Sequence, residues 1–397
     1  MTRIDPPPAA PRLVSLDALR GFDMFIIIGG ERLIAVASEW IAKKWPAWQG
    51  THERLELQLE HVEWQGFRFY DLIFPLFLFL VGAVIPFSLA KVAAAPGAAY
   101  RRIVGRTIFL LVLGLLYNHI LNFDFANTRY TGVLQRLAIG YFFAAMIVYH
   151  VGPRVQLFLF AAILIGYWAI FAYVPMPGGH PGDYRINTNI CDYLDRQYLP
   201  GKLMPAYHEY GDNEGLLSML PAVATALLGA LAGQWLRADT SPGRKIRGLV
   251  VAGAACLALG YTWTGFHLAP FGTATDDDIA NCVWTVPVVK NVWSSSFVLI
   301  AGGWSLLLLA LFYGVIDVWG LKRWAYFFVV IGANALTIYM LQSIVEFDEK
   351  PVEFFFKGLK SLVADEDFRP VVTALADVAV KWLLLWVLYR NRLFLRA

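Results

Sequence analysis

The stretch Glu60–Gly82, EHVEWQGFRFYDLIFPLFLFLVG, decides the fold class of this chain. Its second half is a long apolar run, and a transmembrane helix needs about 20 such residues in succession. His61, Trp64 and Asp71 stand at the mouth of that run. A titratable group at such a depth costs several kcal/mol unless it faces a cavity or a partner. The stretch therefore predicts a membrane helix with chemistry at its entrance.

The composition of the whole chain agrees with this prediction. Hydrophobic residues make up 58% of the 397 residues and charged residues 16%, whereas a soluble domain is about half apolar and a quarter charged. Aromatic residues reach 15%, with 14 Trp, which suits belts at two membrane interfaces. The net charge of +3 is too small to indicate a nucleic-acid partner.

Cysteines and the N-terminus add little chemistry. The three cysteines have no metal-ligand spacing, and no metal site is expected. Cys191 and Cys282 both fall in loops expected outside the membrane, which leaves open one disulfide or two unbonded side chains. The N-terminal prolines precede an apolar segment that is too long and too polar for a cleavable signal peptide.

Successive apolar runs of roughly 20 residues predict an all-α, polytopic helix bundle with about ten transmembrane helices. The expected spans are 17–39, 69–90, 104–122, 131–150, 155–174, 215–236, 247–267, 293–316, 324–346 and 371–391. The first is the weakest because its charged residues include Asp23, Glu31, Arg32 and Glu39. Gly29-Gly30 offers a place where its helix can break. Without a visible internal repeat, residues 15–397 read as one membrane domain after a tail of residues 1–14.

Basic residues orient the chain, because loops on the cytoplasmic side of a membrane carry an excess of Lys and Arg. The short connections that include both termini are denser in Lys and Arg than the alternate set. We therefore expect both termini in the cytoplasm and the loops 40–68, 175–214, 268–292 and 347–370 outside. The expected location is a membrane that the chain crosses many times, and the bacterial inner membrane is what the family resemblance described below implies.

Polar side chains gather at the outer ends of several expected spans, which predicts a shared cavity that opens outward. We expect a substrate in that cavity to contact Trp64, Asn118, Gln135, Arg136, Glu214, Lys290, Asn291 and Trp293. Each also has a structural interpretation. Glu31, Arg136, Asp377 and Lys381 could form ion pairs, and the two amides, Asn118 and Gln135, could simply bridge helices. His61 differs because a neutral imidazole can take and return a proton near pH 7.

Several blocks of the sequence, in order from about residue 12 to residue 345, carry a family resemblance. They are Ser15–Gly21 (SLDALRG), His61–Gly66 (HVEWQG), Asp71–Phe77 (DLIFPLF), Gly132–Leu137 (GVLQRL), Cys191–Pro200 (CDYLDRQYLP), Asp212–Leu217 (DNEGLL) and Lys290–Phe297 (KNVWSSSF). Together they resemble the heparan-α-glucosaminide N-acetyltransferase family of transmembrane acyltransferases. The chain is similar to a bacterial form that consists of the membrane core alone.

The resemblance implies a reaction. Cytoplasmic acetyl-CoA would give its acetyl group to the amino group of glucosamine, or of a saccharide that contains it, on the periplasmic side. The family's catalytic histidine falls on His61, which would act as general base or as acyl acceptor. Asp71 is a candidate partner that orients His61 and stabilises its protonated form. The resemblance also implies that the protein forms a homodimer.

One position departs from the family pattern. Many members carry Asn at the register where this chain has Glu31. A carboxylate there could hold an amino-sugar ammonium, tune His61 or act as base, and we expect Arg136 or Lys381 as its alternative charge partners. This departure leaves the identity of the acceptor open.

A donor site needs cations that face the cytoplasm. Candidates for binding the phosphates of acetyl-CoA are Arg20, Arg101, Arg102, Arg106, Lys322 and Arg323, since Arg matches phosphate oxygens well. The same cations could instead serve only as topology determinants. A rival function from another class is a polytopic transporter of sugars or amino sugars.

Overall fold

The computed structural model describes residues 13–92, 96–204, 211–265, 279–345, 347, 354, 356–358 and 362–395. Within these ranges the chain is helical, with only two isolated β-bridges, which confirms the all-α prediction. The tail 1–12, the ends of two expected spans at 266–267 and 346, and parts of three expected outer loops (205–210, 268–278 and most of 348–361) lie outside the described residues.

Among the residues that the structure describes, seven helices are long and apolar enough to cross a membrane. They are α4 (Phe69–Ala90), α6 (Val133–His150), α7 (Pro153–Tyr173), α9 (Met219–Arg237), α10 (Pro242–Trp263), α11 (Ser295–Phe312) continued by the π-helix η6 (Tyr313–Val318), and α15 (Arg369–Arg390) preceded by η7 (Glu366–Phe368). A bent pair, α12 (Ala325–Ala333) and α13 (Ala335–Gln342), turns by 68° and makes an eighth if it is one span.

The two remaining expected spans are also helical, but they are more polar. Residues 17–39 fold as α1 (Val14–Phe25), the π-helical η1 (Ile26–Gly30) and α2 (Glu31–Lys44). Residues 104–122 fall on α5 (Pro96–Tyr117) and the short η3 (Ile120–Asn122), and α5 carries three arginines in its first half. The count of about ten spans therefore stays a prediction, whereas a polytopic arrangement is supported by seven or eight.

Close approach of helices through small residues builds the core. A Cβ added at Gly82 of α4 would lie 1.9 Å from the Ala226 carbonyl oxygen of α9, and one at Gly229 would lie 1.9 Å from the Phe79 carbonyl oxygen. Such contact is possible only for glycine, and small residues commonly let membrane helices pack backbone to backbone. Helices α4 and α9 therefore form the centre of the bundle, and α6, α7 and α11 pack against them.

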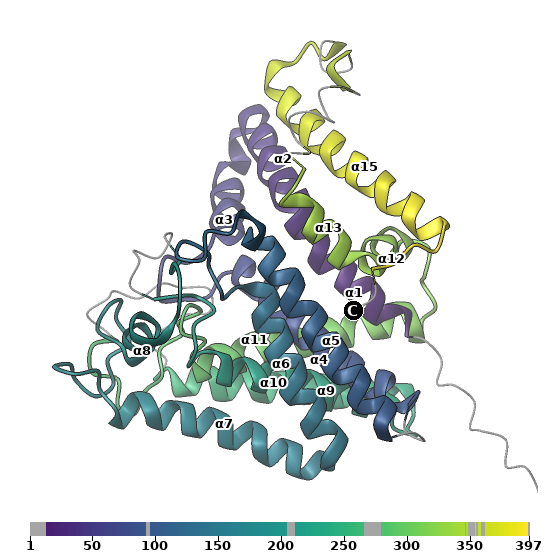
Figure 1. Ribbon diagram of the computed structural model, residues 1–397. Coiled ribbons are helices and arrows are strands. Elements are labelled where there is room, and N and C mark those ends of the chain that lie inside the picture. The colour runs from purple at the N-terminus through teal and green to yellow at the C-terminus, as the bar shows by residue number, and fades with distance from the viewer. Residues whose placement is uncertain are drawn as a thin grey trace, which may run out of the picture.

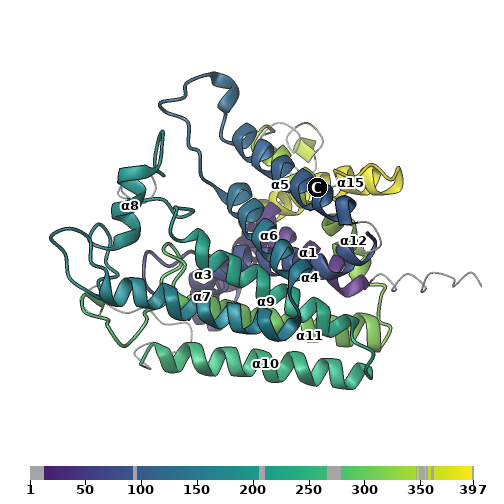
Figure 2. The ribbon, with the colours of Figure 1, turned by 60° about the horizontal axis from the view of Figure 1, so that its bottom comes forward.

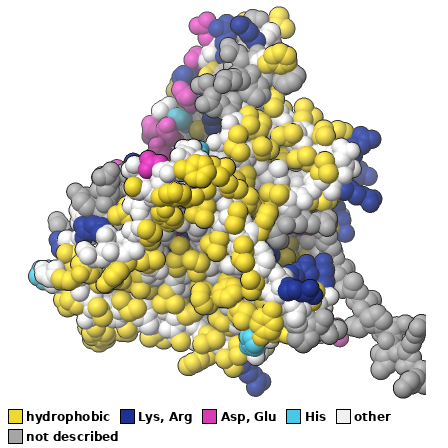
Figure 3. Space-filling model, in the orientation of Figure 1, with side chains coloured by type: hydrophobic (Ala, Val, Ile, Leu, Met, Phe, Trp, Pro, Cys, Tyr) yellow, Lys and Arg dark blue, Asp and Glu magenta, His cyan; other side chains and the backbone are white. Residues whose placement is uncertain are grey.

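The two ends of the molecule differ in character. α1 begins and α15 ends on the right in both ribbon views, and the short helices α3 (Gln49–Leu59) and α8 (Ile190–Tyr198) lie toward the opposite end (Figures 1 and 2). Both described ends of the chain therefore lie at the same end of the bundle. Hydrophobic side chains cover most of the face in Figure 3, with charged groups gathered at its margins. This pattern suits a protein whose sides contact lipid.

Candidate active site

The entrance of α4 is a built cradle for a carboxylate. Asp71 stands in the first turn, and its Oδ2 accepts hydrogen bonds from the backbone N–H groups of Arg68 (3.1 Å) and Val62 (3.3 Å). A negative charge at a helix N-terminus is favoured by the unpaired N–H groups and the helix dipole. Asp71 has no exposed surface. Its other oxygen, Oδ1, is left to act on a partner.

Two segments far apart in sequence meet over this cradle. The segment between α3 and α4 pairs with the segment before α11 through a bridge between Gln65 and Val289 and a 2.9 Å hydrogen bond from Gly66 N to the Val288 carbonyl. Gly66 has φ 132°, a conformation that side chains rarely adopt. This pairing brings Lys290 to His61.

His61, Asp71 and Lys290 form a three-residue cluster. His61 Nδ1 lies 2.9 Å from Asp71 Oδ1, and Lys290 Nζ lies 2.8 Å from the same nitrogen and 3.1 Å from the same oxygen. The His61 side chain is 43% exposed, whereas those of Asp71 and Lys290 are 1% and 17% exposed. The imidazole is therefore held from the protein side and open to a substrate on the other.

The proton arrangement in the cluster decides what His61 can do. If Nδ1–H donates to Asp71, the lone pair of Nε2 is free to accept a proton from a substrate. If the Lys290 ammonium donates to Nδ1, the proton sits on Nε2 and that base is masked. Burial lowers the pKa of Lys290, while the Asp71 carboxylate works in the opposite direction. The ring nitrogen of His61 that carries the proton thus depends on whether Asp71 or Lys290 binds Nδ1.

Tyr70 links this cluster to Glu31. The Tyr70 ring lies 4.6 Å from the His61 ring, centroid to centroid, and the Tyr70 hydroxyl interacts with the Glu31 carboxylate. The two cations that the sequence offered as charge partners of Glu31 are engaged elsewhere. Lys381 Nζ binds Asp377 at 2.7 Å, and Arg136 donates to the Asn213 carbonyl at 2.5 Å.

Arg136, Glu214 and Trp293 belong to a second, bracing network. The Arg136 guanidinium is 1% exposed, donates to Ser218 Oγ and lies 4.5 Å over the Trp293 ring. Glu214 pairs with Arg129, which also holds Asp212 with its Nε at 2.7 Å. Burial alone would raise the pKa of Asp212. The hydrogen bonds and the positive charge of Arg129 outweigh this effect and lower the pKa below its usual value.

The two amides Asn118 and Gln135 contact the α5–α6 connection, in agreement with their structural interpretation. Asn118 Nδ2 donates to the carbonyls of Arg129 (2.7 Å) and Thr131 (2.6 Å). The Gln135 side chain fills the space beside Gly114. Their described contacts hold two helices together and do not reach His61.

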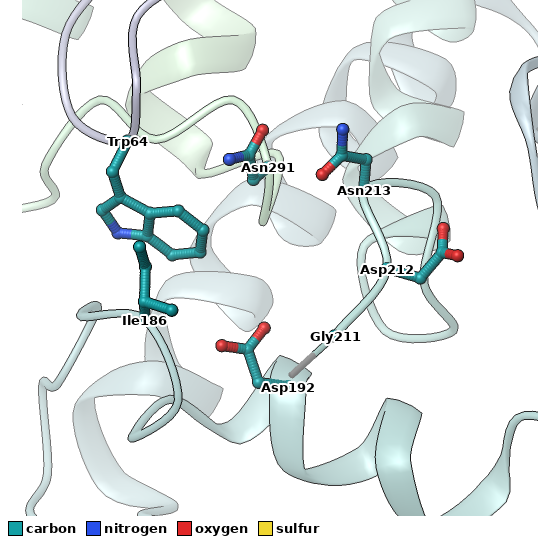
Figure 4. A pocket seen from close by; sticks show the side chains of 7 residues that line it. All are labelled: Trp64, Ile186, Asp192, Gly211, Asp212, Asn213 and Asn291. Atoms are coloured by element: carbon teal, nitrogen blue, oxygen red, sulfur yellow. The ribbon is translucent and has the colours of Figure 1, made fainter. Parts of the chain in front are cut away.

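Trp64 and Asn291 line a small hollow beside the cluster, shown in Figure 4 with Ile186, Asp192, Gly211, Asp212 and Asn213. Trp64 Nε1 donates to the Tyr184 carbonyl at 2.8 Å, which fixes the indole in the wall. Sequence reasoning missed Tyr70, Arg129, Asp192 and Asn213 as parts of the site. Three of them stand inside or beside blocks already quoted, so proximity to a motif was the available signal.

The candidate donor cations are only partly brought together. Arg20 on α1 and Arg102 on α5 both lie near enough to Arg106 to act on its charge, and Arg106 lies 4.4 Å over the Tyr141 ring. Arg20 also pairs with Asp17 at 2.6 Å. Arg101 is exposed next to this group, and Lys322 and Arg323 stand on an exposed turn before α12.

The three cysteines form no disulfide in the structure. Cys191, Cys256 and Cys282 are all buried thiols, and Cys191 Sγ lies 3.2 Å from the Tyr167 hydroxyl. Of the two alternatives left open by the sequence, a disulfide between Cys191 and Cys282 is wrong.

Comparison with known proteins points to one family. No protein-family model matches the chain. It is 25% identical over 438 residues to the human heparan-alpha-glucosaminide N-acetyltransferase, covering 97% of this chain and 60% of the human protein. The mouse protein of the same name is 25% identical over 385 residues, covering 84% of this chain and 56% of its own length. The chain thus spans less than two thirds of these relatives, and the similarity supports a distant member of their family.

Proposed function

We propose that this chain is a membrane acetyltransferase that moves the acetyl group of acetyl-CoA onto the amino group of glucosamine or a glucosamine-containing saccharide. The observation that carries the proposal is the cluster of His61, Asp71 and Lys290 at the mouth of α4, within a chain similar to two N-acetyltransferases named for that acceptor. Because the cluster is exposed on one side, it can meet an acceptor from the aqueous phase.

The chemistry follows from the proton that the acceptor must lose. An amine attacks a thioester only as the free base, so an ammonium must first give up a proton. His61 Nε2 takes that proton while Nδ1–H stays on Asp71 Oδ1, which stabilises the imidazolium that forms. The amine nitrogen then bonds to the acetyl carbon while the bond from that carbon to sulfur breaks. The second proton that the nitrogen loses goes to the departing sulfur, so coenzyme A leaves as the thiol. An acetyl-histidine intermediate is the alternative route through the same side chain.

The donor would enter from the opposite end. Arg20, Arg102 and Arg106 come from two helices, and an arginine cluster is suited to the phosphates of coenzyme A. Both described ends of the chain lie toward that end of the bundle (Figure 1). The density of Lys and Arg in the connections there supports a cytoplasmic location. Acetyl transfer would then run across the membrane, from the cytoplasm to the periplasmic side.

Purified protein tests the activity directly. With acetyl-CoA and glucosamine we expect release of free coenzyme A and formation of N-acetylglucosamine. His61→Ala should lower this rate by about 100-fold or more, the usual contribution of a general base. His180→Ala, which changes an exposed histidine in the loop before α8, is the matched control and should behave as wild type. Transfer by His61→Ala at a tenth of the wild-type rate would exclude the catalytic role.

Transport is a second candidate because two of the membrane segments are broken. The chain breaks at Gly29, where φ is 135°, and α12 and α13 meet at 68°. Discontinuous membrane helices are typical of secondary transporters. The same assay separates the two functions, since a transporter of amino sugars leaves acetyl-CoA intact.

A further inference from the structure

The hollow beside the His61 cluster has walls of a particular chemistry. Its lining comes from the segment after His61, the loop before α8, α8 itself, the loop before α9 and the segment after Lys290. In Figure 4 the side chains of Asn291, Asn213 and Asp192 surround one open space, and the six-membered ring of Trp64 closes it on the fourth side. Four polar or aromatic groups from separate segments thus converge on one point.

The hydrogen-bonding groups of this hollow are incompletely used. Asp192 is 6% exposed, and both hydrogen bonds that it accepts, from Asn187 N (2.8 Å) and Asn189 Nδ2 (2.7 Å), reach Oδ2. Its Oδ1 lies against Gly211, where an added Cβ would come within 2.3 Å. Oδ1 receives neither of these hydrogen bonds, and in Figure 4 the carboxylate points into the open space.

The two asparagines that line the hollow also have side-chain groups without hydrogen-bond partners. Asn291 is 7% exposed, and its side chain makes no hydrogen bond with the part of the chain that the structure describes. Asn213 Oδ1 is buried and also lacks a partner among those residues. Its backbone carbonyl, by contrast, is held by Arg136. The loop is therefore fixed while the side chain is left available.

The unused groups select a ligand that donates hydrogen bonds. Asp192 Oδ1 and Asn213 Oδ1 can only accept, so their partner must carry O–H or N–H groups. The indole nitrogen of Trp64 is already engaged with Tyr184, so the indole presents only carbon to the hollow. Adjacent hydroxyl groups on a carbon ring satisfy both demands. The Asp192 carboxylate could also bind an ammonium group, but the proposed reaction places the amine of the sugar at His61. Lys290 contacts His61, and the next residue, Asn291, lines the hollow, so the two places are adjacent.

We propose that the hollow is a subsite for hydroxyl groups of the acceptor sugar, with Asp192, Asn213 and Asn291 as hydrogen-bonding partners and Trp64 as the apolar wall. This inference rests on the proposed function for the position of the amine, but binding of the sugar can be measured without turnover. The subsite makes the enzyme selective for a sugar over a simple amine. It also assigns a role to Asp192 and Asn213, which lie inside quoted sequence blocks but were not predicted as site residues.

Calorimetric titration tests the subsite on purified protein. The probes are glucosamine and its 3-, 4- and 6-deoxy analogues, each lacking one hydroxyl. We expect wild type to bind at least one analogue about tenfold or more weakly than glucosamine, since one lost hydrogen bond at a buried group costs about 1–3 kcal/mol. Asn213→Ala should bind glucosamine and that analogue equally. Asn127→Ala, which changes an exposed loop amide, should keep the wild-type preference.

The outcomes separate the subsite from the reaction. If wild type binds all four sugars equally, or does not bind glucosamine, the subsite is wrong. The same holds if Asn213→Ala keeps the preference while its thermal unfolding matches wild type. Selective binding without any release of coenzyme A keeps the subsite and overturns the proposed acetyl transfer. Should Asn213→Ala fail to fold, Asn291→Ala provides the second test of the same loss of preference.

Discussion

At the scale of single residues, one carboxylate oxygen serves two partners. Asp71 Oδ1 lies within hydrogen-bonding distance of both His61 and Lys290, and these two also contact each other. When a cation lies next to an imidazole, the position of a single proton decides which ring nitrogen can accept another. His61, Asp71 and Lys290 should therefore be considered together, because each contacts the other two.

The sequence could predict part of this site, for a physical reason. His61 and Asp71 are ten residues apart at the start of one helix, so their proximity is local. Lys290 was expected in the cavity, but its contact with His61 spans 229 residues and depends on the tertiary pairing of Gly66 with Val288. Tyr70 was missed because a tyrosine beside a membrane interface is ordinarily an anchor.

Glu31 gives a residue-scale prediction. Glu31 interacts with the Tyr70 hydroxyl, and the Tyr70 ring lies beside the His61 ring. The substitution Glu31→Gln keeps the shape of the side chain and removes its charge. We expect lower turnover or a higher acceptor KM, and a change in the acidic limb of the pH–rate profile. The measurements are kcat and KM for the acceptor, and kcat/KM against pH.

Glu39→Gln is the control for that experiment. Glu39 lies on the same helix, α2, and pairs with Lys43 on an exposed surface at 3.1 Å. Such a pair contributes little, so this variant should retain the wild-type profile. A Glu31→Gln variant that also matches wild type in turnover, KM and pH profile would make Glu31 a structural group only.

At the scale of elements, the first membrane segment is broken and braced. Gly29 has φ 135°, and the freed Ile28 carbonyl accepts a hydrogen bond from Lys381 Nζ at 2.8 Å. Lys381 also pairs with Asp377 one turn earlier on α15. A buried backbone carbonyl at a helix break needs such a donor. The last helix thereby fixes the break next to which Glu31 begins α2.

Loss of this brace should be costly. Lys381→Met removes the ammonium that binds the Asp377 carboxylate and the Ile28 carbonyl, and breaking one side of a buried ion pair costs about 3–5 kcal/mol. We expect a markedly lower Tm in detergent. The double variant Lys381→Met, Asp377→Leu removes the buried charge as well and should recover much of that loss. Equal Tm values for wild type and Lys381→Met would mean that the pair does not hold the break.

Element boundaries were predictable where polarity changes sharply. The span expected at 69–90 coincides with α4, because Arg68 and Asp71 cap one end and Lys91 follows the other. The break at Gly29 was foreseen because paired glycines favour one. The break between α12 and α13 was not, since it falls at Asn334, which is buried and has φ −126°. Nothing in an apolar run with a single Asn indicates a 68° bend.

At the scale of the whole molecule, both described ends of the chain lie on one side. Helix α1 begins and helix α15 ends at one end of the bundle, opposite α8 (Figures 1 and 2). Hydropathy alone leaves the number of spans between seven and ten, because α1–α2 and α5 carry charged residues. Composition cannot distinguish such a helix from a surface one.

Labelling with an impermeant thiol reagent tests this orientation. Single cysteines at Glu53 on α3 and at Asp239 after α9 are both exposed, and they lie on opposite expected sides. In a cysteine-free background of intact cells, Glu53→Cys should label at once and Asp239→Cys only after the membrane is permeabilised. Labelling of both from the same side would overturn the assigned topology.

Transfer across a sealed bilayer is the most direct test of the central claim. Proteoliposomes would enclose acetyl-CoA with a radiolabelled acetyl group, and an impermeant glucosamine disaccharide would be supplied outside. Wild type should place the label on the external disaccharide, while His61→Ala should leave it at background and His180→Ala should match wild type. The proposed function would be contradicted if the label stayed inside, or if the disaccharide were acetylated only when donor and acceptor shared one compartment.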